Sequence, residues 1–194
     1  MLLIPRLFIG KVVSAFIRFK SYMMTMTVYS CVFFNRQIVI GKSCSFGRSV
    51  LLKATDGGSI TIGQRASLGD CVQIVAQYGR VIIEDDVHIG FGSIVVCQQD
   101  IFIGRDTLIA EYVVIRDQDH NIRTRPIRGA GFITSPIRIG QDVWIGCKAT
   151  ILRGATIGDR CVIGAHALVK SEIPEDMLAI GIPAHAIRRN EPSQ

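Results

Sequence analysis

The stretch from Ile139 to Leu168 reads IGQDVW-IGCKAT-ILRGAT-IGDRCV-IGAHAL, which is five consecutive units of six residues. The same unit recurs earlier in pairs that begin at Ile40, Ile62, Ile83 and Ile103. Over these thirteen units the first residue is always Ile, Leu or Phe, and the second is Gly in ten. The fifth residue is always Cys, Val, Ala, Ser or Thr. A short fixed period of this kind indicates a solenoid.

The spacing within each unit has a physical meaning. Side chains alternate along a short strand, so the first and fifth residues of a unit can both point inward. The large residue fills the interior, the small one fits where two faces converge, and glycine at the second position relieves backbone strain at the corner. Three units make one triangular coil, and stacked coils pair through parallel ladders about 4.8 Å apart. The sequence therefore predicts an all-β fold, a parallel β-helix.

The spacing of coils varies along the chain. The steps between Ile40, Ile62, Ile83 and Ile103 are 22, 21 and 20 residues, which indicates small insertions at one corner of the early coils. The step from Ile139 to Ile157 is 18 residues, the length of an uninterrupted coil.

Composition and charge exclude several classes of protein. With 194 residues, 48% of them hydrophobic, and a mean hydropathy of +0.35, the chain predicts one globular domain and excludes an extended disordered protein. Residues 1–60 carry eight Lys and Arg against one acid, whereas the remainder carries fourteen against fifteen. A basic beginning on a neutral body argues against a general nucleic-acid binder. The six cysteines form no C-x-x-C pair, which favours reduced thiols in a cytoplasmic protein, with Cys44 and Cys161 packed inside.

The beginning of the chain leaves two interpretations open. Residues 1–34 are apolar but interrupted by Arg6, Lys11, Arg18 and Lys20, so no run reaches the ~20 uncharged residues of a membrane-spanning helix. The segment either caps the hydrophobic end of the solenoid as a helix, or rests as a basic apolar segment on the anionic inner membrane surface.

The largest break in the repeat follows Ile115. We interpret residues 121–138 as an external loop, because their fifth positions would break the rule of small residues. His120 stands at the beginning of this loop, after an acidic Asp-x-Asp flank, and a neutral imidazole there could remove a proton from a hydroxyl. The loop also carries three arginines, Arg123, Arg125 and Arg128.

The hexapeptide units resemble those of the hexapeptide acyltransferases, over roughly residues 38–189. The string LIAEYVVIRDQDH, which ends at His120, is similar to the segment of galactoside, maltose and polysaccharide O-acetyltransferases in which the catalytic histidine follows an LIA coil. The resemblance implies a left-handed β-helix and makes His120 the general base. It leaves open whether Asp117, Asp119 or Glu111 orients the imidazole.

The same resemblance implies where the donor binds. In the family a tryptophan lies beside the coenzyme A channel, and this position corresponds to Trp144 in the motif V-W-I-G. Backbone groups that hold the pantetheine arm correspond to Cys147 and Ala165. Lys170, and Arg188 after the family's G-x-P-A ending, are candidates for the coenzyme phosphates, which attract basic side chains.

The function expected from the resemblance is transfer of an acetyl group from acetyl-CoA to a sugar hydroxyl of a surface polysaccharide or its lipid-linked precursor. We expect a homotrimer with sites between subunits, and no metal. Alternatives are an N-acetyltransferase of an amino sugar and a non-catalytic assembly protein. We divide the chain into residues 1–37 as the cap or membrane segment, 38–173 as the β-helix with its loop, and 174–194 as the closing segment.

Overall fold

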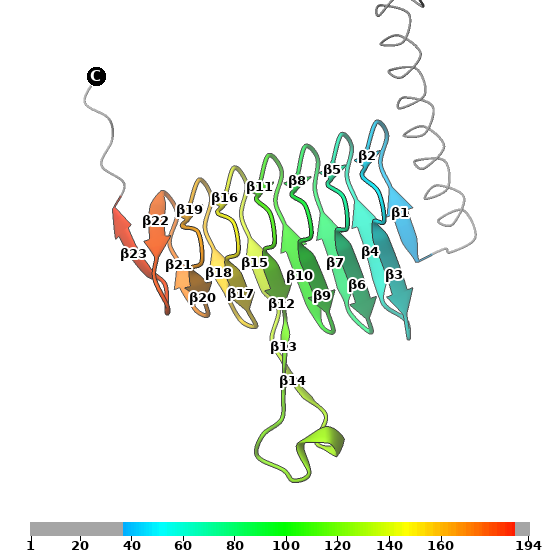
Figure 1. The fold of residues 1–194 in the computed structure, drawn as a ribbon, viewed down its shortest axis with the longest axis vertical. Coiled ribbons are helices and arrows are strands. Elements are labelled where there is room, and N and C mark those ends of the chain that lie inside the picture. The colour runs from blue at the N-terminus through cyan, green and yellow to red at the C-terminus, as the bar shows by residue number, and fades with distance from the viewer. Residues whose placement is uncertain (1–36, 189–194) are drawn as a thin grey trace, which may run out of the picture.

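The computed structural model describes residues 37–188, and these form a stack of β coils with one long protrusion (Figure 1). Sheet A contains β1 (Ile38–Ile40), β4 (Ser59–Ile62), β7 (Arg80–Ile83), β10 (Asp100–Ile103), β15 (Ile137–Ile139), β18 (Thr156–Ile157) and β21 (Glu172–Ile173). Sheet B contains β2 (Ser45–Phe46), β5 (Ser67–Leu68), β8 (His88–Ile89), β11 (Leu108–Ile109), β16 (Trp144–Ile145), β19 (Val162–Ile163), β22 (Met177–Ile180) and β23 (His185–Arg188). Sheet C contains β3 (Leu51–Thr55), β6 (Gln73–Gln77), β9 (Ile94–Cys97), β12 (Val114–Arg116), β17 (Thr150–Leu152) and β20 (Leu168–Val169).

The chain passes through sheets A, B and C in turn, and each strand pairs in parallel with its counterpart in the next coil. First residues of units stack directly, as Ile40 pairs with Ile62, and Ile62 with Ile83. The all-β parallel β-helix with an external segment is thus confirmed. The expected helical cap, residues 1–37, lies outside the described part of the chain except for its last residue. Parallel pairing continues to β22, beyond the expected end of the body at residue 173, and β23 then pairs antiparallel with β22.

The core follows the first and fifth positions of the unit. Among the thirteen units, residues at both positions are buried, with the exceptions of Ile40 and Val50 in the first coil. Cys44 and Cys161 are buried at fifth positions, and burial raises the pKa of both thiols. The predicted packing role of these cysteines therefore agrees with their surroundings.

The positive φ of each corner falls at a different position of the unit from the glycine. The fourth residue of each of the thirteen units has a positive φ, between 53° and 79°, and most of these residues are not glycine. Glycine at the second position serves close packing of coils instead: a Cβ on Gly63 would lie 2.5 Å from the backbone of Glu84 in the next coil. A side chain at the second position would thus cost strain, as expected, through its collision with the next coil, while the positive φ lies two positions further on.

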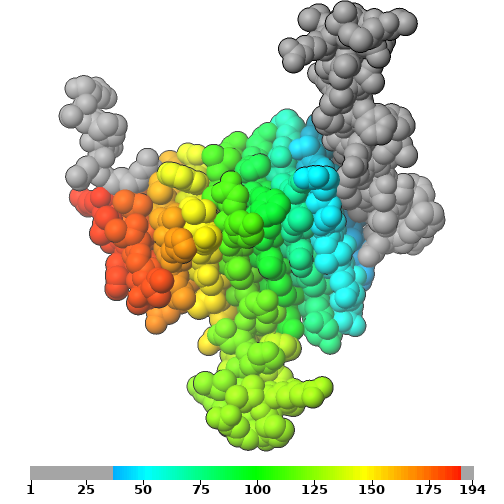
Figure 2. Space-filling model, viewed as in Figure 1, coloured from blue at the N-terminus to red at the C-terminus, as the bar shows by residue number. Residues whose placement is uncertain are grey.

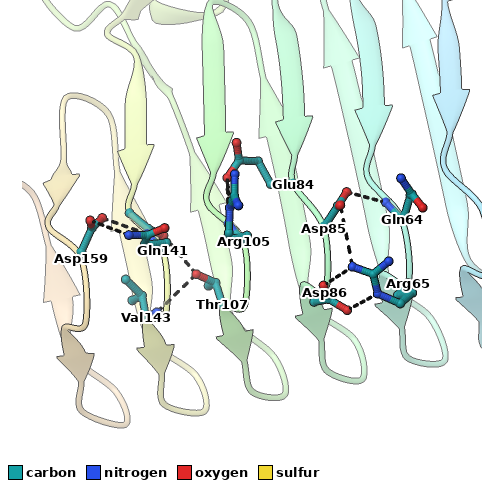
Figure 3. A network of polar contacts seen from close by, with 11 residues as sticks. Gln64, Arg65, Glu84, Asp85, Asp86, Arg105, Thr107, Gln141, Val143 and Asp159 are labelled. Atoms are coloured by element: carbon teal, nitrogen blue, oxygen red, sulfur yellow. Dashed lines mark hydrogen bonds and ion pairs between the residues drawn. The ribbon is translucent and has the colours of Figure 1, made fainter.

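Two buried hydroxyls link successive coils from fifth positions. The Thr107 hydroxyl donates to the carbonyl oxygen of Gly140 at 3.0 Å and accepts from the amide of Val143 at 3.3 Å (Figure 3). Ser93 makes the same pair of bonds to Ala110 and Val113 one coil earlier. A hydroxyl at the fifth position of one unit thus bonds to two backbone groups of the equivalent unit in the next coil: the carbonyl of its second residue and the amide of its fifth.

Thr107→Val should lower the free energy of unfolding by about 1–3 kcal/mol, because a side chain of the same shape leaves a buried carbonyl and amide without this partner. Urea unfolding checks this value, with Thr61→Val on the exposed face of β4 as the matched control. Equal stability of the two variants would show that the hydroxyl contributes nothing.

The corner between sheets A and B carries a ladder of exposed polar contacts (Figure 3). Arg65 donates to both carboxylate oxygens of Asp86 in the next coil, at 2.7 and 2.6 Å, and this bonding holds the pKa of Asp86 below its usual value. Exposed pairs of this kind contribute little to stability, so the stack is held together mainly by its buried core. Within residues 37–188, no helix has the length and apolar character needed to cross a membrane.

Candidate active site

The protrusion leaves the stack at the corner between sheets C and A, which we call the C–A corner. After β12 the chain forms an antiparallel hairpin of β13 (Gln118–His120) and β14 (Phe132–Thr134), with a short 3-10 helix, η1 (Ile127–Gly129), near its tip. The hairpin projects from the side of the prism as a separate lobe (Figure 2).

The boundaries of the protrusion differ from the expected loop, residues 121–138. Gln118 already pairs with Thr134, and Ile137 is back in sheet A opposite Ile101. The protrusion therefore spans 118–136, because three residues on each arm pair with one another before the irregular tip begins.

His120 stands on the third rung of the hairpin, opposite Phe132. The two rings are in contact, with centroids 4.6 Å apart and planes inclined by 33°. The imidazole is exposed and the Phe132 side chain is 45% exposed. The structure thus presents an accessible imidazole on a protruding arm, steadied on one side by an aromatic ring.

Asp117 anchors the root of the hairpin. Its carboxylate is fully buried, and its two oxygens accept from the backbone amides of Gln98 at 2.8 Å and Gln99 at 2.7 Å in the preceding coil. Its own carbonyl accepts from the amide of Ser135 on the returning arm at 3.0 Å. Burial, followed by the neighbouring Asp117 charge, raises the pKa of the Cys97 thiol beside it. One carboxylate therefore fastens the hairpin to the coil before it.

Asp119 bonds on the other side of the hairpin. Its carboxylate accepts from the guanidinium of Arg153 in the next coil at 2.5 Å. Side chains alternate along β13, so Asp119 and His120 point to opposite faces of the strand. Glu111 lies at the corner between sheets B and C, the far end of β12 from the hairpin. In the described chain, none of the three candidate carboxylates is hydrogen-bonded to the imidazole.

Three of the expected donor residues lie on sheet B or at its corner with sheet C. Trp144 opens β16 in sheet B with 55% of its surface exposed. Cys147 and Ala165 occupy equivalent places in successive coils at the corner between sheets B and C, which we call the B–C corner. A Cβ on Gly146 would lie 2.6 Å from the amide nitrogen of Ala165, so these two turns are stacked tightly. Their exposed edge leaves backbone close to the surface.

The two expected phosphate contacts lie elsewhere. Lys170 follows β20 and stands at the C–A corner, whereas Arg188 ends β23 opposite Met177, at the start of β22. The segment between β22 and β23 covers the last B–C corner, where the amide of Ala184 donates to the carbonyl of Leu168 at 2.8 Å. Within one chain the structure therefore does not bring Lys170 or Arg188 beside Ala165.

Several residues that support the hairpin or contact the candidate base could not be recognised in the sequence. The guanidinium of Arg153 and the amide of Gln99 bond to the hairpin from the coils on either side of it, and Phe132 contacts His120 from the opposite strand of the hairpin. A shallow groove of about 410 Å³ on sheet A reaches Pro136 at the hairpin root, where Arg138 lies 4.6 Å above the ring of Phe102. In residues 37–188, no three side chains of His, Cys, Asp or Glu gather as a metal site would require.

Comparison with known proteins agrees with this arrangement. The model of the bacterial transferase hexapeptide family (six repeats) matches residues 136–171. A "Probable acetyltransferase" of Mycobacterium tuberculosis is 37% identical over 81% of this chain and 53% of its own length. The "Putative lipopolysaccharide biosynthesis O-acetyl transferase WbbJ" of Escherichia coli K12 is 33% identical over 68% of this chain and 72% of its own length.

Solved structures give the same result. The polySia specific acetyltransferase NeuO aligns with a TM-score of 0.55 and 25% identity, over 79% of this chain and 81% of that one. The chain spans about half the length of the mycobacterial relative but nearly three quarters of the length of WbbJ. The six-residue repeat, the parallel coils and the likeness to WbbJ lead to one conclusion. The chain belongs to the bacterial hexapeptide-repeat transferase family.

Proposed function

We propose that the protein is a left-handed β-helix acetyltransferase that transfers the acetyl group of acetyl-CoA to a sugar hydroxyl of a surface polysaccharide or its lipid-linked precursor. The observation that carries the proposal is the exposed imidazole of His120 on a braced hairpin, directly after the LIA coil, in a chain of this family. The names of the relatives support acetyl transfer, and that of WbbJ supports an O-linked product.

The chemistry needs one base and a polarised thioester. His120 takes the proton of the acceptor hydroxyl while its oxygen attacks the thioester carbonyl, which forms the C–O bond. Backbone amides stabilise the resulting oxyanion. Collapse of the tetrahedral intermediate breaks the C–S bond, and the proton held by the imidazole passes to the thiolate, which leaves as coenzyme A.

The site is composite in this proposal, with His120 of one subunit facing the Trp144 region of its neighbour in a homotrimer. Support comes from their separation in one chain, since His120 leaves the C–A corner while Trp144 lies on sheet B and Cys147 at the B–C corner. An isolated two-stranded hairpin is marginally stable in water. Ile122 on this hairpin is 68% exposed, which suits an arm that packs against a second copy.

The acceptor carries negative charge in this proposal. Arg123, Arg125 and Arg128 are exposed near the hairpin tip, and no ion pair joins them to an acid in the described part of the chain. NeuO is named for an acidic polymer, polysialic acid, which supports such an acceptor. We place the enzyme in the cytoplasm, with basic residues 1–34 either capping the stack or holding it to the anionic inner membrane face.

Replacing the three arginines by serine should raise the KM for an acidic acceptor about tenfold, because each exposed charge contact contributes up to about 1 kcal/mol. The KM is measured by steady-state kinetics at low salt, with sialyllactose as the acidic acceptor and lactose as its neutral counterpart. An equal change for both sugars would contradict a charge-specific role.

The proposed function is tested by thiol release from acetyl-CoA by the purified full-length protein, with and without sugar acceptors. We expect release that depends on the acceptor, and an acetylated sugar whose acetyl group is removed by mild alkali, as an ester is. An alkali-stable amide would contradict O-transfer, and no acceptor-dependent release would contradict acetyl transfer to sugars.

A further inference from the structure

The direction in which His120 faces follows from its neighbours on β13. Gln118 lies on the same face as His120, since side chains alternate along a strand. With its amide nitrogen turned to its acceptors, Gln118 donates to Oδ1 of the neighbouring Asp117 at 2.7 Å. It also donates, at 3.2 Å, to the carbonyl of Val96, which lies in the coil before the hairpin. Asp119 bonds to the coil after it. The imidazole therefore faces the N-terminal coils.

The C–A corner of those coils is longer than elsewhere. The strands that meet at this corner, β3 with β4, β6 with β7 and β9 with β10, are longer than those of the later coils. The early coils accordingly have 22, 21 and 20 residues, whereas the steps from Ile139 to Ile157 and from Ile157 to Ile173 have 18 and 16. The turns between these longer strands form a surface that we call the corner ledge, residues 55–59, 77–79 and 98–99. Coils repeat about every 4.8 Å, so the ledge extends from the hairpin root for about 10 Å or more on the side that His120 faces.

Tyr78 stands at the outer edge of the ledge. Its side chain is 62% exposed, its φ is 69°, and its amide donates to the carbonyl of Thr55 at 3.3 Å. A Cβ on the following residue, Gly79, would lie 2.1 Å from the carbonyl oxygen of Gln99. The turn is thus seated directly on the next coil, and the aromatic ring is held outward from a fixed backbone rather than folded into the core.

The other side chains of the ledge are hydrogen-bonding groups suited to an uncharged ligand. Gln77 donates to the carboxylate of Asp56 at 2.9 Å, and Gln99 is exposed beside them. Arg80, at the start of β7, is neutralised by Asp100, with which it makes bonds of 2.9 and 3.0 Å. An exposed aromatic ring beside amides and one carboxylate offers a stacking surface and directed hydrogen bonds.

We propose that the corner ledge binds the sugar ring of the acceptor and that Tyr78 is a specificity-determining residue that stacks on this ring. The proposal rests on the proposed function, because it is the acceptor hydroxyl that must reach His120. It places the uncharged pyranose between the ledge and the hairpin, and leaves any acidic group of the acceptor to the arginines of the tip.

The test is steady-state kinetics of full-length Tyr78→Ala and Tyr78→Phe at saturating acetyl-CoA, with nitrophenyl galactoside, glucoside and mannoside as acceptor probes. The alanine variant should raise the acceptor KM about tenfold while the KM for acetyl-CoA is unchanged, and the phenylalanine variant should keep the wild-type acceptor KM. Tyr112→Ala, which removes an exposed tyrosine of positive φ from the B–C corner, is the matched control.

Two results overturn the inference and are distinguishable from failure of the proposed function. An unchanged acceptor KM in Tyr78→Ala, or an equal rise in Tyr112→Ala, removes the ledge from acceptor binding while acetyl transfer stands. If no hexoside stimulates thiol release by the wild-type protein, the proposed function fails, and the inference fails with it.

Discussion

His120→Ala should lower kcat by about 10²- to 10⁴-fold, because the acceptor hydroxyl loses the base that takes its proton in the transition state. The KM for acetyl-CoA should change little, since the base acts on the acceptor hydroxyl and the proposed pantetheine contacts, Cys147 and Ala165, are made by backbone groups. Initial rates of acceptor-dependent thiol release measure both quantities. Stability should be unaffected, because the imidazole is exposed and its contact with Phe132 lies at the surface.

His88→Ala is the control for this substitution. It removes another exposed imidazole, from β8 in sheet B, and should leave kcat unchanged. A His120→Ala variant with the wild-type rate would remove the residue from the mechanism, and the hairpin would then serve only packing or recognition.

Asp117→Asn should lower the free energy of unfolding by about 1–3 kcal/mol and reduce kcat as well. The substituted amide keeps the shape of the carboxylate but turns a donor toward one of the two backbone amides, of Gln98 and Gln99, that the carboxylate now satisfies. The hairpin root loses its fastening, so the imidazole is held less firmly. Urea unfolding and steady-state kinetics measure the two effects.

Asp119→Asn is the matched control two residues further along the chain, where the carboxylate bonds to the following coil. Its pair with Arg153 is partly exposed, so the loss of stability should stay below about 1 kcal/mol. Hydrogen exchange adds a local readout: in Asp117→Asn, amides of β13 and β14 should exchange faster while those of β9 and β12 stay protected. Equal protection of the hairpin in wild type and Asp117→Asn would contradict the anchoring role.

The repeat predicted the stack and its core because a six-residue period specifies which residues point inward. The corner geometry was not predictable in the same way. Fourth positions hold Ser43, Arg65, Tyr112 and Lys148 among others, so no residue type marks the positive φ there. Glycine at the second position gave a visible signal, but its cause lies in the next coil, about twenty residues away, where the added Cβ would meet backbone.

The position of His120 could be predicted from the resemblance, whereas its surroundings could not. Asp117 and Asp119 lie three residues and one residue before it in the sequence, and this nearness suggested an orienting carboxylate. The structure directs them to Gln99, 18 residues earlier, and to Arg153, 34 residues later. Contacts between coils have no local signature, and the same holds for the hairpin pairing that moves the loop from 121–138 to 118–136.

The central claim is that His120 of one subunit acts on a thioester bound along its neighbour. It is tested most directly by co-expressing His120→Ala with Ala165→Trp, which places a bulky ring over the stacked turns of the B–C corner. Each variant alone should be inactive. The mixture should regain about a quarter of the wild-type activity. A site is complete only where a chain with intact His120 faces a chain with intact Ala165, and random assembly of equal amounts gives this at about one interface in four. A mixture as inactive as its components would contradict a site shared between subunits.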